Sequence, residues 1–234
     1  MAALIEVRGL EFCYPDGTEA LRGIDLELSA GETLILLGAN GSGKTTLLLH
    51  LNGLLQAKAG RIVVCGLEVV PGNFPAIRNK VGFVFQDADD QLFMPTVLED
   101  VAYGLLNRGL DPSAARAAAE EALADVDLTH VALRAPYHLS GGEKRRAALA
   151  GVLAMKPEIL VFDEPTTALD PPAQRNLAGL MRRLGHVKIV STHDAAFARA
   201  VGTRAVFFER GRVAGEGTVD EVLQRFDWEA HLGQ

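Results

Sequence analysis

The sequence has only two cysteines, Cys13 and Cys65, among its 234 residues. Each is isolated in a strand-like segment, so we expect two free thiols in a reducing compartment rather than a disulfide. No run approaches the roughly 18 uninterrupted apolar residues that a membrane-spanning helix needs. The first residues lack a basic stretch followed by a long apolar one, so no secretory signal is expected. These absences favour a soluble, cytoplasmic chain.

An excess of positive charge is also missing. The sequence has 23 Lys and Arg residues and 30 Asp and Glu residues, which gives a formal net charge of −7. Nucleic-acid-binding surfaces are usually basic, so we expect no nucleic-acid partner. Basic clusters at residues 144–146 and 182–183 fall on predicted helices, where we interpret them as solvated faces. The histidines show no metal-ligand spacing; they are His50, His130, His138, His186, His193 and His231.

What the sequence does contain is an alternation of apolar runs and helical segments. Residues 4–14 and 19–28 are β-rich and flank the turn 15–18, which predicts an antiparallel hairpin. The segment 44–54 has helical character. Continuous apolar runs typical of buried parallel strands occur at 33–37, 81–85, 159–162 and 188–191. Strands separated by helices predict an α/β fold with a parallel sheet.

The stretch from about 96 to 156 contains almost no β-rich run. Asp111-Pro112 caps an alanine-rich helix over 113–124, and 141–155 is a second strong helix candidate. The final third returns to strand patterns, with a hairpin of 204–209 and 212–216 around Gly211. We therefore predict one domain, 1–234, divided in two. The nucleotide-binding α/β core with an N-terminal antiparallel β subdomain takes about 1–90 and 157–234, and a helical subdomain is inserted at about 91–156.

A glycine-rich loop follows the first buried strand. The segment Gly38-Ala39-Asn40-Gly41-Ser42-Gly43-Lys44-Thr45 fits the phosphate-binding P-loop, with an apolar strand before it and a helix after it. Its glycines let backbone N–H groups point at phosphate oxygens, and the helix N-terminus adds positive potential. We expect Lys44 to reach the β- and γ-phosphates and Thr45 to place its hydroxyl on Mg²⁺. Thr46 completes the predicted nucleotide-binding set.

The apolar run 159–162 ends in two carboxylates, Asp163 and Glu164. In isolation, two carboxylates at the end of an apolar strand often do no more than keep the surface soluble. Downstream of a P-loop, Asp163 is placed to hold Mg²⁺ through water, and Glu164 to face the attacking water as a general base.

Two polar residues lie at other strand ends, where open α/β sheets place their ligands. Gln86 follows the strand 81–85, and His193 follows the strand 188–191 by one residue. Either side chain could be an ordinary structural hydrogen-bonding group. Beside this site we predict that they sense the γ-phosphate or the water.

Ser140-Gly141-Gly142-Glu143 forms a further glycine-containing motif. It is typical of a helix capping box, in which Ser140 caps the helix and Glu143 reaches back to the Ser140 N–H. The two glycines also leave bare N–H groups at a helix start, which is a ready anion site. Both interpretations can hold together.

Taken together, these motifs resemble the ATP-binding subunit of ABC transporters. The set comprises Walker A at 38–45, Gln86, the signature at 139–143, Walker B at 159–164, Ala168-Leu169-Asp170 and His193, in the family's order. The resemblance implies a P-loop NTPase with a RecA-like parallel-sheet core that hydrolyses ATP. No long coiled-coil segment or second Walker A is present, which argues against the alternatives of a DNA-repair ATPase or a tandem translation factor.

The resemblance also implies a head-to-tail dimer, either a homodimer or a heterodimer with a related ATPase. Walker A of one subunit and the partner's Ser140, Gly141, Gly142 and Glu143 would enclose each ATP. Asp170 would lie in the loop that links the two sites, and Gln86 would join Thr45 and Asp163 around Mg²⁺. His193 would bind the γ-phosphate and help to position Glu164. Tyr14 matches the aromatic position that stacks on adenine, although it could equally pack into the core.

A finer similarity lies in residues 85–93 and 95–102 and in Glu143-Lys144-Arg145-Arg146. These resemble the ATPases of energy-coupling-factor importers, especially the cobalt and nickel branch, although Ala88 replaces that branch's usual proline. The similarity implies a peripheral protein on the cytoplasmic face of the membrane, bound to a transmembrane coupling subunit and substrate-binding membrane subunits near Gln86–Phe93. The acidic residues Asp87, Asp89 and Asp90 are either a solvated loop or part of that contact. Biotin or another vitamin is the alternative cargo.

Overall fold

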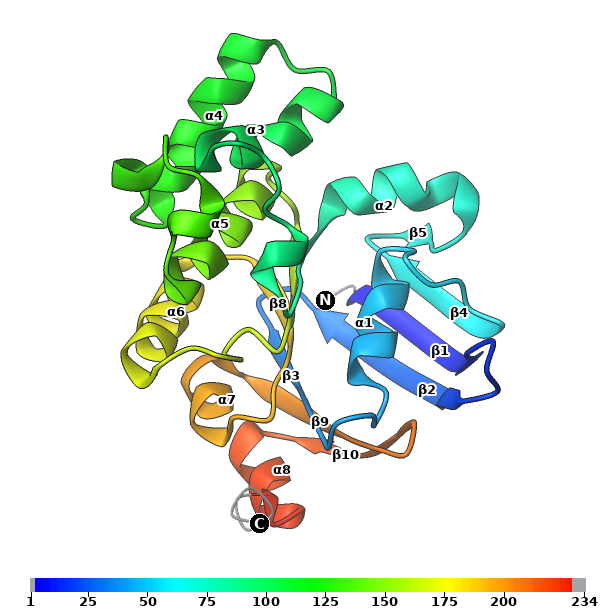
Figure 1. Cartoon of the computed structure of the whole chain (residues 1–234). Coiled ribbons are helices and arrows are strands. Elements are labelled where there is room, and N and C mark those ends of the chain that lie inside the picture. The colour runs from blue at the N-terminus through cyan, green and yellow to red at the C-terminus, as the bar shows by residue number, and fades with distance from the viewer. Residues whose placement is uncertain (1–2, 229–234) are drawn as a thin grey trace.

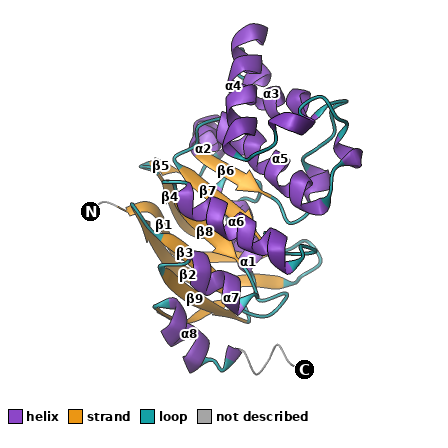
Figure 2. Ribbon diagram, turned by 90° about the vertical axis from the view of Figure 1, so that its left-hand side faces the viewer, coloured by secondary structure: helices purple, strands orange, loops and turns teal. Residues whose placement is uncertain are grey.

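A computed structural model describes residues 3–228 of the chain, and Figures 1 and 2 show its arrangement. Two β-sheets form one end of the molecule, and the helices α3, α4 and α5 gather at the other (Figure 1). The larger sheet has the strand order β10-β9-β3-β8-β7-β6, and the smaller one has the order β2-β1-β4-β5. The predicted combination of a parallel-sheet core with an antiparallel sheet and inserted helices is therefore confirmed.

The strands of the larger sheet have bounds close to those expected from the apolar runs. They are β3 (Thr33–Leu37), β6 (Val81–Val84), β7 (Ile159–Asp163), β8 (Val187–Ser191), β9 (Arg204–Glu209) and β10 (Arg212–Gly217). Strands β6, β7, β8, β3 and β9 run parallel, and β10 is the antiparallel edge strand of the predicted hairpin. Strand β6 ends one residue early because the Phe85 N–H is taken by the Gln91 side chain instead of a neighbouring strand.

The smaller sheet packs over one face of the larger one. It consists of β1 (Ala3–Cys13), β2 (Glu19–Ser29), β4 (Ala59–Val64) and β5 (Leu67–Glu68), and β1 pairs antiparallel with β2 as predicted. Cys65 lies in the turn after β4 with a φ of 48° and not in a strand, and both cysteines are free thiols.

Alternation along β3 explains why the core has two parts. Leu34 and Leu36 face α1 (Lys44–Leu51) and the smaller sheet, whereas Ile35 and Leu37 face the helices that follow β6 in the chain. Successive side chains of a strand point to opposite faces, so a strand covered on both sides is apolar throughout. Helix α1 is three residues shorter than predicted because the chain turns at Asn52 and Gly53, where Gly53 has a φ of 70°.

The helices between β6 and β7 form a separate layer at the end of the sheet, and further helices cover its second face (Figure 2). The inserted helices are α3 (Val97–Asn107), α4 (Pro112–Asp125) and α5 (Gly141–Ala154). Asp111 accepts from the N–H groups of Ser113 and Ala114, which confirms the predicted start of α4. The helices over the second face are α6 (Pro171–Arg183), α7 (Ala195–Val201) and α8 (Val219–Arg225). Helix α2 (Phe74–Lys80) instead packs through Ile77 on the side of α1 and the smaller sheet.

Candidate functional site

A cavity of about 590 Å³ opens at the carboxyl ends of the parallel strands and brings together most of the predicted site residues. Open α/β sheets bind their ligands at this edge. The residues that line the cavity are Tyr14, Thr18, Glu19, Ala20, Asn40, Gly41, Gly43, Lys44, Thr45, Thr46, Gln86, Glu164, Thr167 and His193.

The loop between β3 and α1 can adopt its tight curve only because of its glycines. Gly38 has a φ of 140°, and a Cβ there would lie 2.3 Å from the Phe208 carbonyl oxygen. Gly43 has a φ of 110°, and its Cβ would lie 2.6 Å from the Ala20 carbonyl oxygen. Side chains at either position are therefore excluded by both conformation and space.

Lys44 lies buried at the centre of this loop. Its ammonium donates hydrogen bonds to the carbonyl oxygens of Gly38 at 2.7 Å and Ala39 at 3.1 Å, and it lies 3.9 Å from Glu164 Oε1. Burial lowers the pKa of Lys44, and the nearby charges of Glu164 and Asp163 oppose that shift. A buried cation at a helix N-terminus is well placed to bind phosphate oxygens.

Asp163 ends β7 beside the P-loop helix. Its Oδ1 accepts from the Thr45 hydroxyl at 3.0 Å and from the Ser191 hydroxyl at 2.5 Å. The same Ser191 oxygen accepts the Glu164 N–H at 2.9 Å, so one side chain orients both consecutive acids. We did not predict Ser191 as a site residue. The feature of the sequence that could have indicated it is a hydroxyl residue at the end of the apolar strand β8.

Glu164 faces the cavity from a strained backbone position. Its φ is 43°, in the left-handed region that non-glycine residues rarely adopt, and its side chain is buried. Glu164 Oε2 accepts from His193 Nδ1 at 2.8 Å and from the His193 N–H at 3.3 Å. Among the described residues, Oε1 has no hydrogen-bond partner although it is buried, which leaves an acceptor directed at the site.

Tyr14 and Gln86 both line the cavity. The Tyr14 hydroxyl lies 3.0 Å from Thr46 Oγ1, and its ring packs edge-on against Phe12 at a centroid distance of 5.0 Å. Tyr14 therefore packs against the core of the small sheet, as the alternative interpretation has it, and also lines the cavity. Gln86 lines this cavity and also a neighbouring one of about 620 Å³ that contains Thr45 and Asp163.

The signature residues do not line the P-loop cavity. Ser140 and Glu143 form the predicted capping box, in which Glu143 Oε2 accepts from the Ser140 N–H at 2.8 Å. Ser140 and Gly141 are exposed at the start of α5, and Asp170 is an exposed cap of α6 that accepts from the Ala173 N–H. Gly141 lines the neighbouring cavity, whereas Ser140, Gly142, Glu143 and Asp170 line neither.

The basic cluster at 144–146 is not a solvated face, so that prediction is wrong. Arg145 is 5% exposed and donates to the Phe85 carbonyl oxygen at 2.6 Å, and burial lowers its pKa. Lys144 pairs with Asp89 at 2.7 Å, so that acidic residue is partnered within the chain. The sequence pattern of the helix could not reveal this contact, because the carbonyl that accepts from Arg145 lies 60 positions away in the chain. Arg182 and Arg183 are exposed as expected.

The residues around the P-loop fit a magnesium nucleotide. The backbone of the P-loop leaves no room for a side chain at Gly38 or Gly43. The buried Ser42 hydroxyl has no hydrogen-bond partner among residues 3–228. Thr45, Asp163 and Gln86 supply hydroxyl, carboxylate and amide oxygens, the type of ligand that Mg²⁺ prefers. The described part of the chain holds no group of three or more His, Cys, Asp and Glu suited to a metal; His231 lies outside it. A single protein carboxylate is enough to bind Mg²⁺ where phosphate oxygens of the substrate complete the coordination shell of the ion.

Comparisons with known proteins agree with this geometry. Residues 21–167 match the family model described as ABC transporter. The energy-coupling factor transporter ATP-binding protein EcfA of Carboxydothermus hydrogenoformans is 46% identical over 220 residues, which cover 93% of this chain and 82% of that protein.

Two solved structures extend the similarity. CbiO1 from Clostridium perfringens, described as part of the ABC transporter complex CbiONQ, matches with a TM-score of 0.87 and 34% identity over 97% of this chain and 93% of that chain. MJ0796, a bacterial ABC transporter cassette with a dimeric structure, matches with a TM-score of 0.83 and 30% identity over 92% and 98% of the two chains. Among residues 3–228, none of the helices has both the length and the apolarity needed to cross a membrane. The chain belongs to the ABC transporter family of ATP-binding proteins and is an ABC ATPase.

Proposed function

We propose that this chain is the ATP-hydrolysing subunit that energises an energy-coupling-factor importer. The observation that carries the proposal is the group formed by Lys44, Glu164 and His193 around one cavity beside the P-loop, with Asp163 bonded to the Thr45 hydroxyl next to it. The similarity to EcfA and to CbiO1 supports the importer class.

Each side chain has a separate task in the proposed reaction. The P-loop N–H groups and Lys44 bind the phosphates of ATP, and Tyr14 stacks on the adenine. Glu164 accepts a proton from the water that attacks the γ-phosphorus in line. His193 holds the Glu164 carboxylate through Nδ1 and presents the rest of its ring to the γ-phosphate. Thr45, Gln86 and Asp163 would hold Mg²⁺, which neutralises charge that develops on the phosphate oxygens.

We propose that the complete site needs a second subunit. Ser140 and Gly141 are exposed at the start of α5, Gly142 is half-buried there, and none of the three lines the P-loop cavity of its own chain. A head-to-tail dimer would place them against the γ-phosphate bound by the partner, with Asp170 near the junction of the two sites. The dimeric structure of the similar cassette MJ0796 supports this arrangement.

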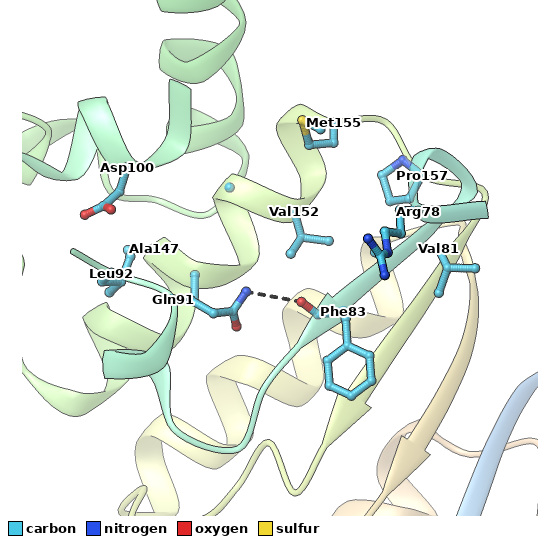
Figure 3. Close-up of a pocket in the computed structure, with 13 residues that line it drawn as sticks. Arg78, Val81, Phe83, Gln91, Leu92, Asp100, Ala147, Val152, Met155 and Pro157 are labelled. Carbon is cyan, nitrogen blue, oxygen red and sulfur yellow. Dashed lines mark hydrogen bonds between the residues drawn. The ribbon is translucent and has the colours of Figure 1, made fainter. Parts of the chain in front are cut away.

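The membrane partner is proposed to dock next to residues 86–93. A cavity of about 220 Å³ lies there between β6 and the helical layer (Figure 3). Asp100 lies on its helical side and Arg78 on the opposite side, and Gln91 donates to the Phe83 carbonyl oxygen at 3.1 Å. Docking of a transmembrane coupling subunit at this position would hold the chain at the cytoplasmic face of the membrane.

The same place marks the proposed boundary between subdomains. Strands β6 and β7 are neighbours in the sheet although α3, α4 and α5 come between them in sequence. This pairing supports an α/β core over about 1–90 and 157–234 with a helical subdomain over about 91–156. We propose cobalt or nickel as the cargo, which uptake of each metal by vesicles containing the complete transporter would test.

The substitution Glu164→Gln tests the proposed reaction. We expect ATP binding to be retained and turnover to fall by about 10²-fold or more, because the amide cannot accept the proton from water. Binding of labelled ATP and release of phosphate measure the two effects separately. Glu209→Gln, at an exposed acid that ends β9, is the matched control and should hydrolyse ATP normally. Near-normal hydrolysis by Glu164→Gln would refute the assignment.

A further inference from the structure

Residues 226–228, directly after α8, reach back to the site. Trp228 lies after the last turn of α8 and is 6% exposed. Its indole N–H donates a hydrogen bond to the backbone carbonyl oxygen of His193 at 3.1 Å. The two residues are 35 positions apart, so this contact ties the C-terminal part of the chain to the loop that carries the γ-phosphate-facing histidine.

An aromatic cluster fixes the indole in place. Phe226 stacks on Phe207 with ring centroids 4.0 Å apart and an interplanar angle of 4°, and Trp228 packs edge-on against Phe207 at 5.4 Å. Phe207 lies in β9, where it pairs with Leu37, the last residue of the strand that leads into the P-loop. All three rings line a cavity of about 370 Å³ that also contains Asn40, Gly41 and Ser42. The cluster therefore shares a cavity with the P-loop and, through Trp228, contacts the backbone of His193.

The His193 side chain is half exposed, and its hydrogen bond among the described residues joins Nδ1 to Glu164 Oε2. The His193 backbone N–H donates to the same oxygen. On one side of His193, Asp194 N–H donates to the Thr192 hydroxyl, and Asp194 then caps α7. The His193 carbonyl is the remaining backbone group that can fix the direction of the imidazole. A small rotation of this peptide would move Nδ1 away from Glu164 Oε2, and a misplaced base reduces the rate of the chemical step.

We propose that Trp228 is a positioning residue for ATP hydrolysis, which orients His193, and through it Glu164, by its indole N–H hydrogen bond. The inference rests on the proposed roles of His193 and Glu164. It predicts that the hydrogen bond contributes to turnover and not to nucleotide binding, because the bond is made to the His193 carbonyl. The indole ring, which shares a cavity with Asn40, Gly41 and Ser42, keeps its shape when only the N–H is replaced.

The sharpest test replaces only the indole N–H. Incorporation of 3-benzothienylalanine at position 228 keeps the shape of tryptophan but has sulfur in place of the donor. In the full chain we expect kcat to fall by about 3- to 10-fold, the range for one lost hydrogen bond, with the KM for ATP unchanged. The genetically encoded variant W228F should show at least the same loss. Unchanged kcat in the benzothienyl variant overturns the proposal.

Two further measurements separate positioning from general stability. Thermal unfolding of the benzothienyl variant should stay near that of the wild type, and a fall in kcat with an equal rise in KM would contradict a positioning role. Trp228 is the only tryptophan in the sequence, so quenching by acrylamide reports on it alone. We expect low accessibility in the wild type; free access to the quencher would also overturn the proposal.

Failure of the inference can be distinguished from failure of the proposed function. If Glu164→Gln loses turnover and the benzothienyl variant does not, the role of Trp228 is refuted and the reaction assignment stands. If Glu164→Gln hydrolyses ATP normally, the reaction assignment itself is refuted.

Discussion

Ser191 joins the two acids of the site. Its hydroxyl donates to Asp163 Oδ1 at 2.5 Å, and its oxygen accepts the Glu164 N–H at 2.9 Å. The side chain is fully buried, so neither bond can be replaced by bulk water without local opening. Asp163 and Glu164 therefore depend on a residue from the neighbouring strand for their relative orientation.

We expect Ser191→Ala to lower kcat by about 3- to 10-fold, because each lost hydrogen bond contributes about 0.5–1.5 kcal/mol. The free energy of unfolding should fall by about 1–2 kcal/mol, because a buried carboxylate oxygen loses a donor. Steady-state hydrolysis and urea unfolding measure the two effects. Ser113→Ala, at an exposed serine in the first turn of α4, is the control and should leave kcat unchanged. Wild-type kcat in Ser191→Ala would contradict the role of the hydroxyl.

Local sequence patterns predicted much of this site but not its supporting contacts. The P-loop, Asp163 and Glu164 follow from motifs in which neighbouring residues act together. The structure brings Lys44, Thr45 and Glu164 to one cavity and bonds Asp163 to Thr45 beside it. Ser191 and Trp228 act on groups 28 and 35 positions away. Contacts of that separation depend on how the strands and α8 are placed, which a single sequence pattern does not determine.

At the scale of elements, α5 connects the signature to the site through Arg145. This guanidinium donates to the Phe85 carbonyl, one residue before Gln86, and also approaches the Thr167 carbonyl at 3.5 Å. Its Nε is buried without a hydrogen-bond partner among the described residues. A buried cation with two carbonyl acceptors fixes the distance between α5 and the end of β6.

Arg145→Lys should destabilise the protein by about 1–3 kcal/mol in the free energy of unfolding, because a compact ammonium cannot reproduce the planar fork and leaves an acceptor unsatisfied. Urea unfolding checks this value. Arg182→Lys, at an exposed position on α6, should change stability by no more than about 0.5 kcal/mol. Equal stability of the two variants would show that the buried contact is unimportant.

The capping box of α5 predicts that the stability of the folded protein depends on pH. Hydrogen bonds from the Ser140 hydroxyl and N–H lower the pKa of Glu143 from its usual 4.5. A lowered pKa in the folded state means that the ionised cap is stabilising above about pH 4.5, and that this contribution is lost as the pH falls through the folded-state value.

We therefore expect acidification from pH 7 towards pH 3.5 to destabilise the wild type more than Glu143→Gln. The amide keeps an acceptor for the Ser140 N–H but does not titrate. The difference should be about 0.5 kcal/mol or less, since the carboxylate is partly exposed and its interactions are weakened by solvent. Thermal unfolding of both proteins across this pH range measures it. Identical pH profiles would contradict the contribution of the ionised cap.

At the scale of the whole molecule, the order of apolar runs predicted the architecture well. Strands buried on both faces give continuous apolar segments, so β3, β7 and β8 were found with nearly correct bounds. The short strands β4 and β5 and helix α2 were not predicted. In β4 the first three residues are exposed and only Ile62 and Val64 are buried, which leaves a weak pattern.

The division of the site between two surfaces is the central property of the whole molecule. Lys44, Glu164 and His193 line one cavity, whereas Ser140 is exposed at the start of α5 outside it. In the proposed dimer, each chain would supply two half-sites. A symmetric head-to-tail pair would bring each half-site against its complement.

Complementation between two inactive variants tests this claim most directly. Lys44→Ala removes the phosphate-binding cation, and Ser140→Arg blocks the signature. Each alone should be inactive. A mixed dimer regains one intact site, so an equal mixture should recover about a quarter of wild-type hydrolysis if subunits exchange freely and each site works independently. Hydrolysis no greater than the sum of the two separate variants would contradict the shared site.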